Sequence, residues 1–208
     1  MSDSATYDPA VDAPAHHHPV YDYDSGPPVE RGKFAIWLFL ATEVMFFSGL
    51  IGAYIVLRSA SATWPAPEDR LAIDITAANT FILITSSWMM VKSLFAAQKG
   101  DKAGLLKWLG ATIIGGAIFV GVQVFEYFQL IEHGWKPNTD IFCSTFYVTT
   151  GFHGFHVVIG VIWLICAWFA ALRGKYTPNN ILGLELAGLY WHFVDLVWVL
   201  LFTIIYLF

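Results

Sequence analysis

The stretch Phe34–Leu57, FAIWLFLATEVMFFSGLIGAYIVL, constrains what this chain can fold into more than any other part of it. It contains a single charged residue, Glu43. As a helix it would be about 36 Å long, enough to cross a hydrocarbon core of about 30 Å with some tilt. Glu43 would then lie about 13 Å from its start, near the middle of the bilayer, where an ionisable group costs several kcal/mol without a protein partner. The fold must therefore supply a partner for Glu43.

The composition of the whole chain agrees with a membrane setting. Of its 208 residues 57% are hydrophobic and only 13% are charged, about half the charged fraction of roughly 25% in soluble domains. The sequence therefore predicts an all-α polytopic membrane protein without a separate soluble domain of ordinary size. No basic cluster indicates a nucleic-acid partner. Cys143 and Cys166 lie far apart, without metal-type spacing, and are interpreted as small buried hydrophobes.

Five transmembrane spans are predicted, at about 34–57, 75–97, 105–130, 141–172 and 181–208. Residues 1–32 are polar, Pro-rich and acidic, and we expect a flexible tail that precedes the five-helix membrane domain, 33–208. With five spans, the side of the N-terminus would hold eight basic residues against three on the other side. This difference predicts a cytoplasmic N-terminus and a C-terminus outside.

Ionisable residues inside the other predicted spans are candidates for the functional site. Glu126 lies near the outer end of the third span, and His153 and His156 are spaced to share one face of the fourth. In the last span the spacing of seven and three residues brings three more to one side: Glu185, His192 and Asp195. Polar groups at such depths turn inward and pair. We therefore expect a buried polar network that could include Glu43.

Spacing alone leaves several interpretations of these residues open. A proton or ion pathway could use the acids and histidines, but no broken helix or inverted repeat supports a transporter. A haem could bind between His156 and His192, although bulky aromatic neighbours leave little room for a macrocycle. A di-metal site would need more carboxylates near the histidines. The leading interpretation is structural: these groups satisfy one another and any lipid head group between the helices.

Four motifs add a resemblance to a known family. They lie in order in four different spans: LATEVMFFSGL, VFEYFQLIEHG, STFYVTTGFHGFHVVIG and GLYWHFVDLVWVLLFTIIY. In order and spacing they resemble subunit III of the haem–copper terminal oxidases, with the greatest similarity to cytochrome c oxidase subunit III, over about residues 33–208. Alternatives within the same superfamily are subunit III of a quinol oxidase and a nitric-oxide-reductase-associated homologue.

The resemblance implies the five-helix bacterial form, in two bundles with a lipid-filled cleft, in the bacterial inner membrane. It implies a non-catalytic subunit without haem, copper or other metal, which binds phospholipid, stabilises subunit I and supports its proton uptake. Subunit I would be in direct contact, and subunit II, small subunits or a supercomplex would be further partners. Haem and copper would lie in partner subunits.

The resemblance also assigns roles to the buried polar residues. Glu43 matches the family's membrane-buried glutamate beside the lipid cleft. The other buried polar positions match polar positions of the family motifs and would be structural: Glu126, His153, His156, Glu185, His192 and Asp195. In an apolar cleft desolvation favours the neutral acid, so we expect Glu43 to donate a hydrogen bond to a neighbouring helix, with His156 or His192 as its acceptor.

Overall fold

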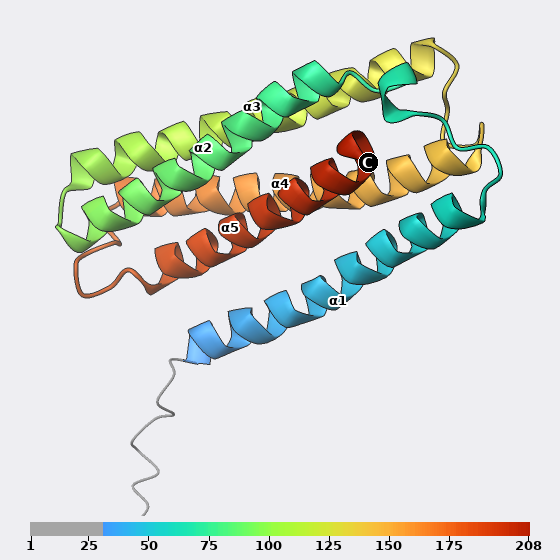
Figure 1. The fold of residues 1–208 in the computed structure, drawn as a ribbon. Helices are drawn as coiled ribbons and strands as arrows, with labels where there is room; N and C mark the ends of the chain where they lie inside the picture. Colours follow the sequence, from blue (N-terminus) through green and yellow to red (C-terminus); the bar gives the residue numbers. More distant parts are fainter. Residues whose placement is uncertain (1–30) are drawn as a thin grey trace, which may run out of the picture.

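The computed structural model describes residues 31–208, so residues 1–30 of the predicted tail lie outside the described part of the chain. The prediction was wrong for the last two tail residues, Arg31 and Gly32, because they form the start of the first helix. Five long helices follow one another (Figure 1): α1 (Arg31–Ala60), α2 (Ile73–Gln98), α3 (Lys102–Glu132), α4 (Ile141–Leu172) and α5 (Leu182–Phe202). A short turn, η1 (Pro67–Asp69), lies in the first loop, and a π-helical turn, η2 (Thr203–Leu207), continues α5. All five helices are long and apolar enough to cross a membrane. The prediction of an all-α polytopic membrane protein is confirmed.

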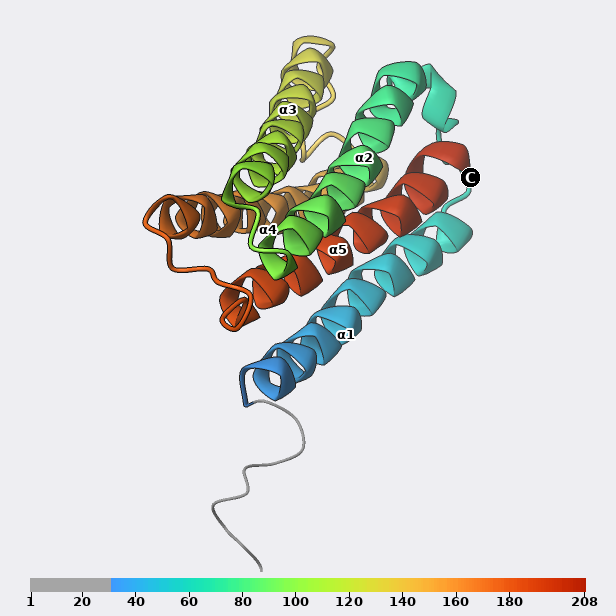
Figure 2. The ribbon, with the colours of Figure 1, turned by 90° about the vertical axis from the view of Figure 1, so that its left-hand side faces the viewer.

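Helices α2 to α5 form one four-helix bundle, in which each helix packs against the next and α5 packs back against α2. Helix α1 lies outside this bundle, beside α5 (Figure 2), and it also contacts α4. Where the resemblance implied two bundles, residues 31–208 form a bundle of four helices and one further helix. Only a narrow stripe of α1 is buried against its neighbours: Ile36, Leu40, Phe47 and Tyr54.

Local signals set the ends of the helices. Asp101 and Asp140 are the N-caps of α3 and α4, where their side chains accept hydrogen bonds from the backbone N–H groups of Gly104 (2.9 Å) and Cys143 (2.7 Å). Gly100 follows the end of α2 with a φ of 74°, a left-handed conformation that favours glycine. The chain can therefore reverse between α2 and α3 within a few residues.

The centre of the bundle is built around Trp191 of α5, which is 1% exposed. Its ring lies against Gly116 of α3 and Gly160 of α4, where a Cβ atom would come within 2.5 Å and 3.0 Å of ring carbons. Its indole N–H donates to the hydroxyl of Ser86 on α2 at 3.1 Å. One side chain thus joins all four helices, and two glycines make the room for it.

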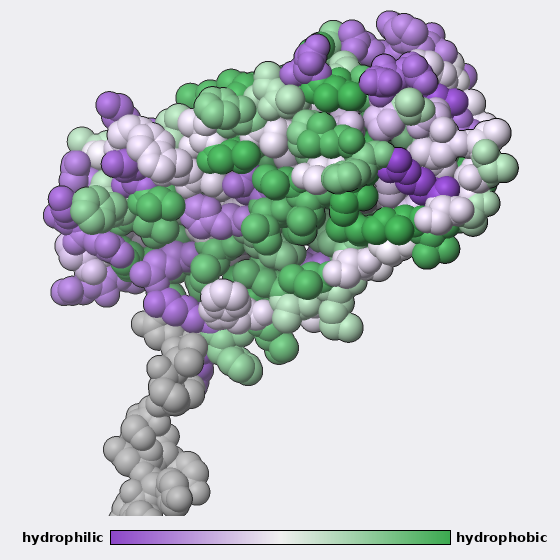
Figure 3. All heavy atoms as spheres, in the orientation of Figure 1, coloured by the Kyte–Doolittle hydropathy of each residue, from purple (hydrophilic) through white to green (hydrophobic). Residues whose placement is uncertain are grey.

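The outer surface carries an apolar belt between two polar ends (Figure 3). Large side chains that are more than half exposed occur on every helix, for example Phe34, Phe81, Ile114, Phe155 and Leu196. A surface of this kind would aggregate in water and is stable in a hydrocarbon medium. The described part of the chain is therefore a membrane domain.

Candidate functional site

Glu43 of α1 meets His156 of α4 in the membrane interior. Glu43 Oε2 lies 3.0 Å from His156 Nε2, with the two side chains 15% and 12% exposed. Although the distance is short, the geometry of the contact is not that of a hydrogen bond. The partner that Glu43 needs is thus on α4.

The backbone of α4 fixes the orientation of the His156 ring. Its Nδ1 lies 2.7 Å from the carbonyl oxygen of Phe152, which can only accept, so Nδ1 carries a hydrogen. Nε2 is therefore the ring nitrogen that faces the Glu43 carboxyl group.

Aromatic rings enclose this pair on the α1–α4 side. Phe46 and Phe47 of α1 have ring centroids 6.2 Å and 5.2 Å from that of His156, and Phe155 of α4 lies at 6.0 Å. These rings border the pair, whose side chains are only 15% and 12% exposed. The low-dielectric surroundings strengthen the attraction within the pair and raise the cost of losing either partner.

Two more polar contacts hold the ends of α1. At its beginning, Lys33 Nζ forms an ion pair of 2.8 Å with Glu185 Oε2 of α5. At its end, the guanidinium of Arg58 donates to the carbonyl oxygen of Phe208. Together with Glu43 these contacts attach α1 to the bundle at three levels. They supplement its narrow apolar stripe.

His192 and Asp195 of α5 turn to α2, away from the Glu43 pair. His192 Nδ1 lies 3.3 Å from the hydroxyl of Ser87, and Asp195 interacts with the same hydroxyl. The Oδ1 atom of Asp195 is buried and has no hydrogen-bond partner within residues 31–208. Since Glu185 contacts α1, the three polar residues of α5 reach two different helices.

Glu126 is the centre of a separate network at the other end of the bundle. It is 6% exposed, accepts a hydrogen bond from the hydroxyl of Tyr206 at 2.9 Å, and lies 3.1 Å from the hydroxyl of Thr76. The network therefore joins α2, α3 and η2. Its three side chains satisfy one another in the interior, as expected for buried polar groups.

His153 is fully buried inside the bundle. Its ring stacks on Trp198 with centroids 4.9 Å apart, and Phe119 approaches it edge-on at 6.0 Å. Neither ring nitrogen has a hydrogen-bond partner among the described residues. His153 and His156 are close in sequence, but one lies inside the bundle and the other faces α1.

These positions bear on the haem and metal interpretations. His156 contacts α1 and His192 contacts α2, so the two imidazoles do not converge on a shared space. Among residues 31–208 no group of three His, Cys, Asp or Glu side chains could hold a metal ion. Except for His153, these polar groups contact partners on other helices, two or three at a time.

Sequence reasoning missed the polar stripe of α2, which supplies several of these partners. The stripe consists of buried residues at helical spacing: Thr76, Asn79, Thr80, Ser86, Ser87 and Ser93. Thr80, for example, accepts a hydrogen bond of 2.8 Å from the indole of Trp198. The signal was a period of three to four residues in small polar side chains, which is typical of helix interfaces in membranes.

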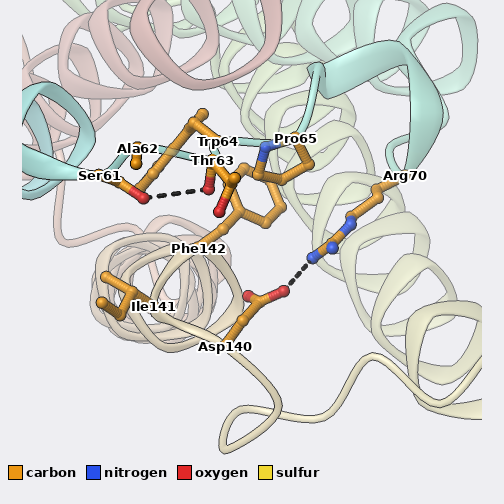
Figure 4. Close-up of a pocket in the computed structure, with 9 residues that line it drawn as sticks. All are labelled: Ser61, Ala62, Thr63, Trp64, Pro65, Arg70, Asp140, Ile141 and Phe142. Atoms are coloured by element: carbon orange, nitrogen blue, oxygen red, sulfur yellow. Dashed lines mark hydrogen bonds and ion pairs between the residues drawn. The ribbon is translucent and has the colours of Figure 1, made fainter.

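A pocket of about 690 Å³ lies at the end of the molecule where the first and third loops meet (Figure 4). Arg70 reaches across it to form an ion pair with Asp140, and its guanidinium also lies 5.4 Å from the ring centre of Trp135. Burial would raise the pKa of Asp140, but the N–H of Cys143 and the Arg70 guanidinium outweigh it and lower this pKa. The carboxylate is therefore ionised at neutral pH and fastens the first loop to α4.

Comparison with known proteins decides the family. The sequence profile described as cytochrome c oxidase subunit III matches residues 20–208. The chain belongs to the cytochrome c oxidase subunit III family. The cytochrome c oxidase subunit 3 of Synechocystis sp. is 41% identical over 207 residues, which cover 98% of this chain and 83% of that protein. That of Thermostichus vulcanus is 36% identical, with 93% and 90% covered. The probable subunit 3 of Nocardia farcinica is 39% identical, with 82% and 84% covered.

Membership of the cytochrome c oxidase subunit III family confirms the resemblance seen in the four motifs. It makes the chain subunit III of a haem–copper oxidase, which implies a complex with other oxidase subunits. Helix α1 exposes a wide apolar surface, because only 17% of its most hydrophobic stretch is buried against the other helices. Such a surface is consistent with neighbouring subunits in the membrane.

Proposed function

We propose that this chain is a non-catalytic subunit of an aerobic terminal oxidase, whose haem and copper centres are held by partner subunits. The family match over residues 20–208 carries the proposal. The contacts of Glu43, Glu126 and Glu185 support it, because each of these side chains joins two helices. Cytochrome c is the proposed electron donor, since the similar proteins are named cytochrome c oxidase subunits.

The proposed direct partner is subunit I, with subunit II in the same complex. We propose that the chain is located in the bacterial inner membrane. Its N-terminus would lie in the cytoplasm, because the predicted topology puts most basic residues on the same side as the N-terminus. Phospholipid is proposed along the exposed side of α1, near Glu43. In this position the subunit would stabilise subunit I and support its proton uptake.

Isolation of the complex tests this proposal. The full chain, purified from its native membrane in a mild detergent, should bring with it subunits that show haem absorption and oxygen consumption with reduced cytochrome c. Once separated from those subunits the chain should show no haem spectrum. A Soret band in the separated chain would instead identify a haem-binding protein, and proton flux into liposomes that contain only this chain would identify a transporter.

The Glu43 pair leads to a prediction about turnover. In Glu43→Gln the amide can still donate to Nε2 of His156, so the intact oxidase should start at nearly the wild-type rate. In Glu43→Leu the imidazole loses its partner in an apolar site, which should lower complex stability by about 1–3 kcal/mol. Initial oxygen consumption and the thermal unfolding of the purified complex measure the two effects.

Met45→Leu is the matched control, because Met45 lies on the same helix and is 76% exposed. It should change neither rate nor stability. Immediate and complete loss of activity in an intact Glu43→Gln complex would contradict the structural role and make Glu43 a required proton carrier.

A further inference from the structure

Two tryptophans and two lysines form a cluster where α2 and α3 lie side by side. The rings of Trp88 and Trp108 meet edge to face with centroids 5.7 Å apart. Lys92 Nζ lies 5.1 Å from the ring centre of Trp88, and Lys107 Nζ lies 5.4 Å from that of Trp108. Two ammonium groups are thus held over a pair of indoles contributed by adjacent helices.

The depth of this cluster corresponds to the edge of the hydrocarbon layer. Lys92 lies six residues before the end of α2, and Lys107 five residues after the start of α3, so both are about 8–9 Å from the helix ends. Helices of 26 and 31 residues exceed a hydrocarbon core of about 30 Å and project beyond it. Both ammonium groups therefore lie near the level of lipid head groups, where tryptophan is also favoured.

Within residues 31–208 no carboxylate forms an ion pair with either lysine. Asp101, the nearest acid in the hairpin sequence, is used as the N-cap of α3. The interaction with the indoles does not neutralise the two positive charges. At this depth they favour an anion supplied from outside the described chain.

An apolar groove begins one helical turn deeper on the same two helices. It has a volume of about 340 Å³ and is lined by Phe81, Ile82, Thr85, Ser86, Met89, Ala111, Ile114, Gly115 and Ile118. Its floor is low because Ala111 and Gly115 have little or no side chain, while its walls include the exposed side chains of Phe81 and Ile114. At the end of the groove nearest the cluster, Met89 is three residues from Lys92, and Ala111 is four residues from Lys107. The cationic cluster and the groove are therefore continuous.

We propose that this face of α2 and α3 binds an anionic phospholipid. The phosphate is held between the ammonium groups of Lys92 and Lys107, and one acyl chain occupies the groove below. Two cations without a protein anion select a net negative head group, because the choline or ethanolamine cation of a zwitterionic lipid would be repelled by them. This lipid lies on the far side of the bundle from α1, which packs on α4 and α5, and is separate from the lipid proposed beside Glu43.

The test compares lipid binding by the delipidated oxidase complex that contains the full chain. Native mass spectrometry is used to titrate the complex with phosphatidylglycerol and, separately, with phosphatidylcholine. Since each lysine near a membrane surface contributes about fivefold, the double variant Lys92→Gln with Lys107→Gln should bind phosphatidylglycerol about 25-fold more weakly at this site. Its binding of phosphatidylcholine should change little.

Two further variants distinguish a specific lipid-binding site from nonspecific electrostatic attraction of anionic lipid. Arg173→Gln with Lys175→Gln removes two charges from the loop after α4, which lies at the same end of the molecule (Figure 1), and should leave the phosphatidylglycerol site intact. Ala111→Phe fills the groove without touching a lysine and should weaken both lipids. Thermal unfolding of each complex confirms that the variants are folded.

Three results would overturn the proposal. One is an equal loss of phosphatidylglycerol in the lysine variant and in the loop variant, which would show only general electrostatic attraction. Another is unchanged binding in Ala111→Phe. The third is competition by glycerol 3-phosphate as effective as that by the lipid, because the groove would then contribute nothing.

Discussion

Replacing Gly116 by Val is expected to break the four-helix bundle. A Cβ at this position would lie 2.5 Å from Cη2 of Trp191 and 2.8 Å from Cγ2 of Val161, closer than carbon atoms pack. Neither neighbour can give way easily, because Trp191 is also enclosed by Gly160 and held by Ser86. Overpacking of this kind typically costs about 1–3 kcal/mol, and more where the neighbours cannot move. The variant complex should unfold at a lower temperature and lose this subunit during purification.

Gly121→Val provides the matched control on the same helix. No atom lies within 4 Å of the Cβ position at Gly121, so the same side chain, with the same helix propensity, should have little effect there. Combining Gly116→Val with Trp191→Leu should restore part of the stability, because the smaller side chain frees space for the valine. Equal losses in the two valine variants would show that close packing on Trp191 is not the cause.

Glu126→Leu should give the second large loss of stability. The hydroxyl of Tyr206, which is 1% exposed, would lose its acceptor in the interior, and the side chain of Thr76 would lose its interhelical contact. A buried group left without a partner costs about 1–3 kcal/mol. Glu126→Gln keeps an oxygen that can accept from Tyr206 and should stay close to wild type. The unfolding temperature of the purified complex measures both variants.

A double variant distinguishes an unsatisfied hydroxyl from other causes. In Glu126→Leu with Tyr206→Phe both partners are removed, and the stability should rise above that of Glu126→Leu alone, since replacing both members of a hydrogen bond is nearly neutral. If the second substitution brings no recovery, the loss comes from the shape of leucine and not from the hydrogen bond.

The buried polar residues illustrate how far sequence reasoning reaches into the site. Placing Glu43 and His156 at one depth required only helix geometry, and the expectation that Glu43 has a histidine partner agrees with the contact of 3.0 Å. Choosing His156 over His192 was not possible, because the rotation of α4 and α5 about their axes depends on how Trp191 and its glycines pack. The partners of Glu185 and Glu126 were missed for the same reason.

The sequence by itself determined the number of helices, their membrane setting and the family. A bilayer admits only segments that satisfy their own backbone and are apolar over about 20 residues, so composition and length were sufficient for the helices and their setting. The family followed from the order and spacing of the four motifs. It also determined that Glu43 needs a partner, because an isolated carboxyl at that depth is costly.

Only the tertiary structure decided which partner that is, and that α1 stands beside a bundle of four helices. Interhelical contacts depend on side chains far apart in sequence, such as Glu43 with His156 and Ser86 with Trp191. Helical periodicity shows which face of a helix is polar, but the relative rotation and depth of two helices follow from their packing. The partner that helix geometry required for Glu43 is thus His156, and their contact joins α1 to α4.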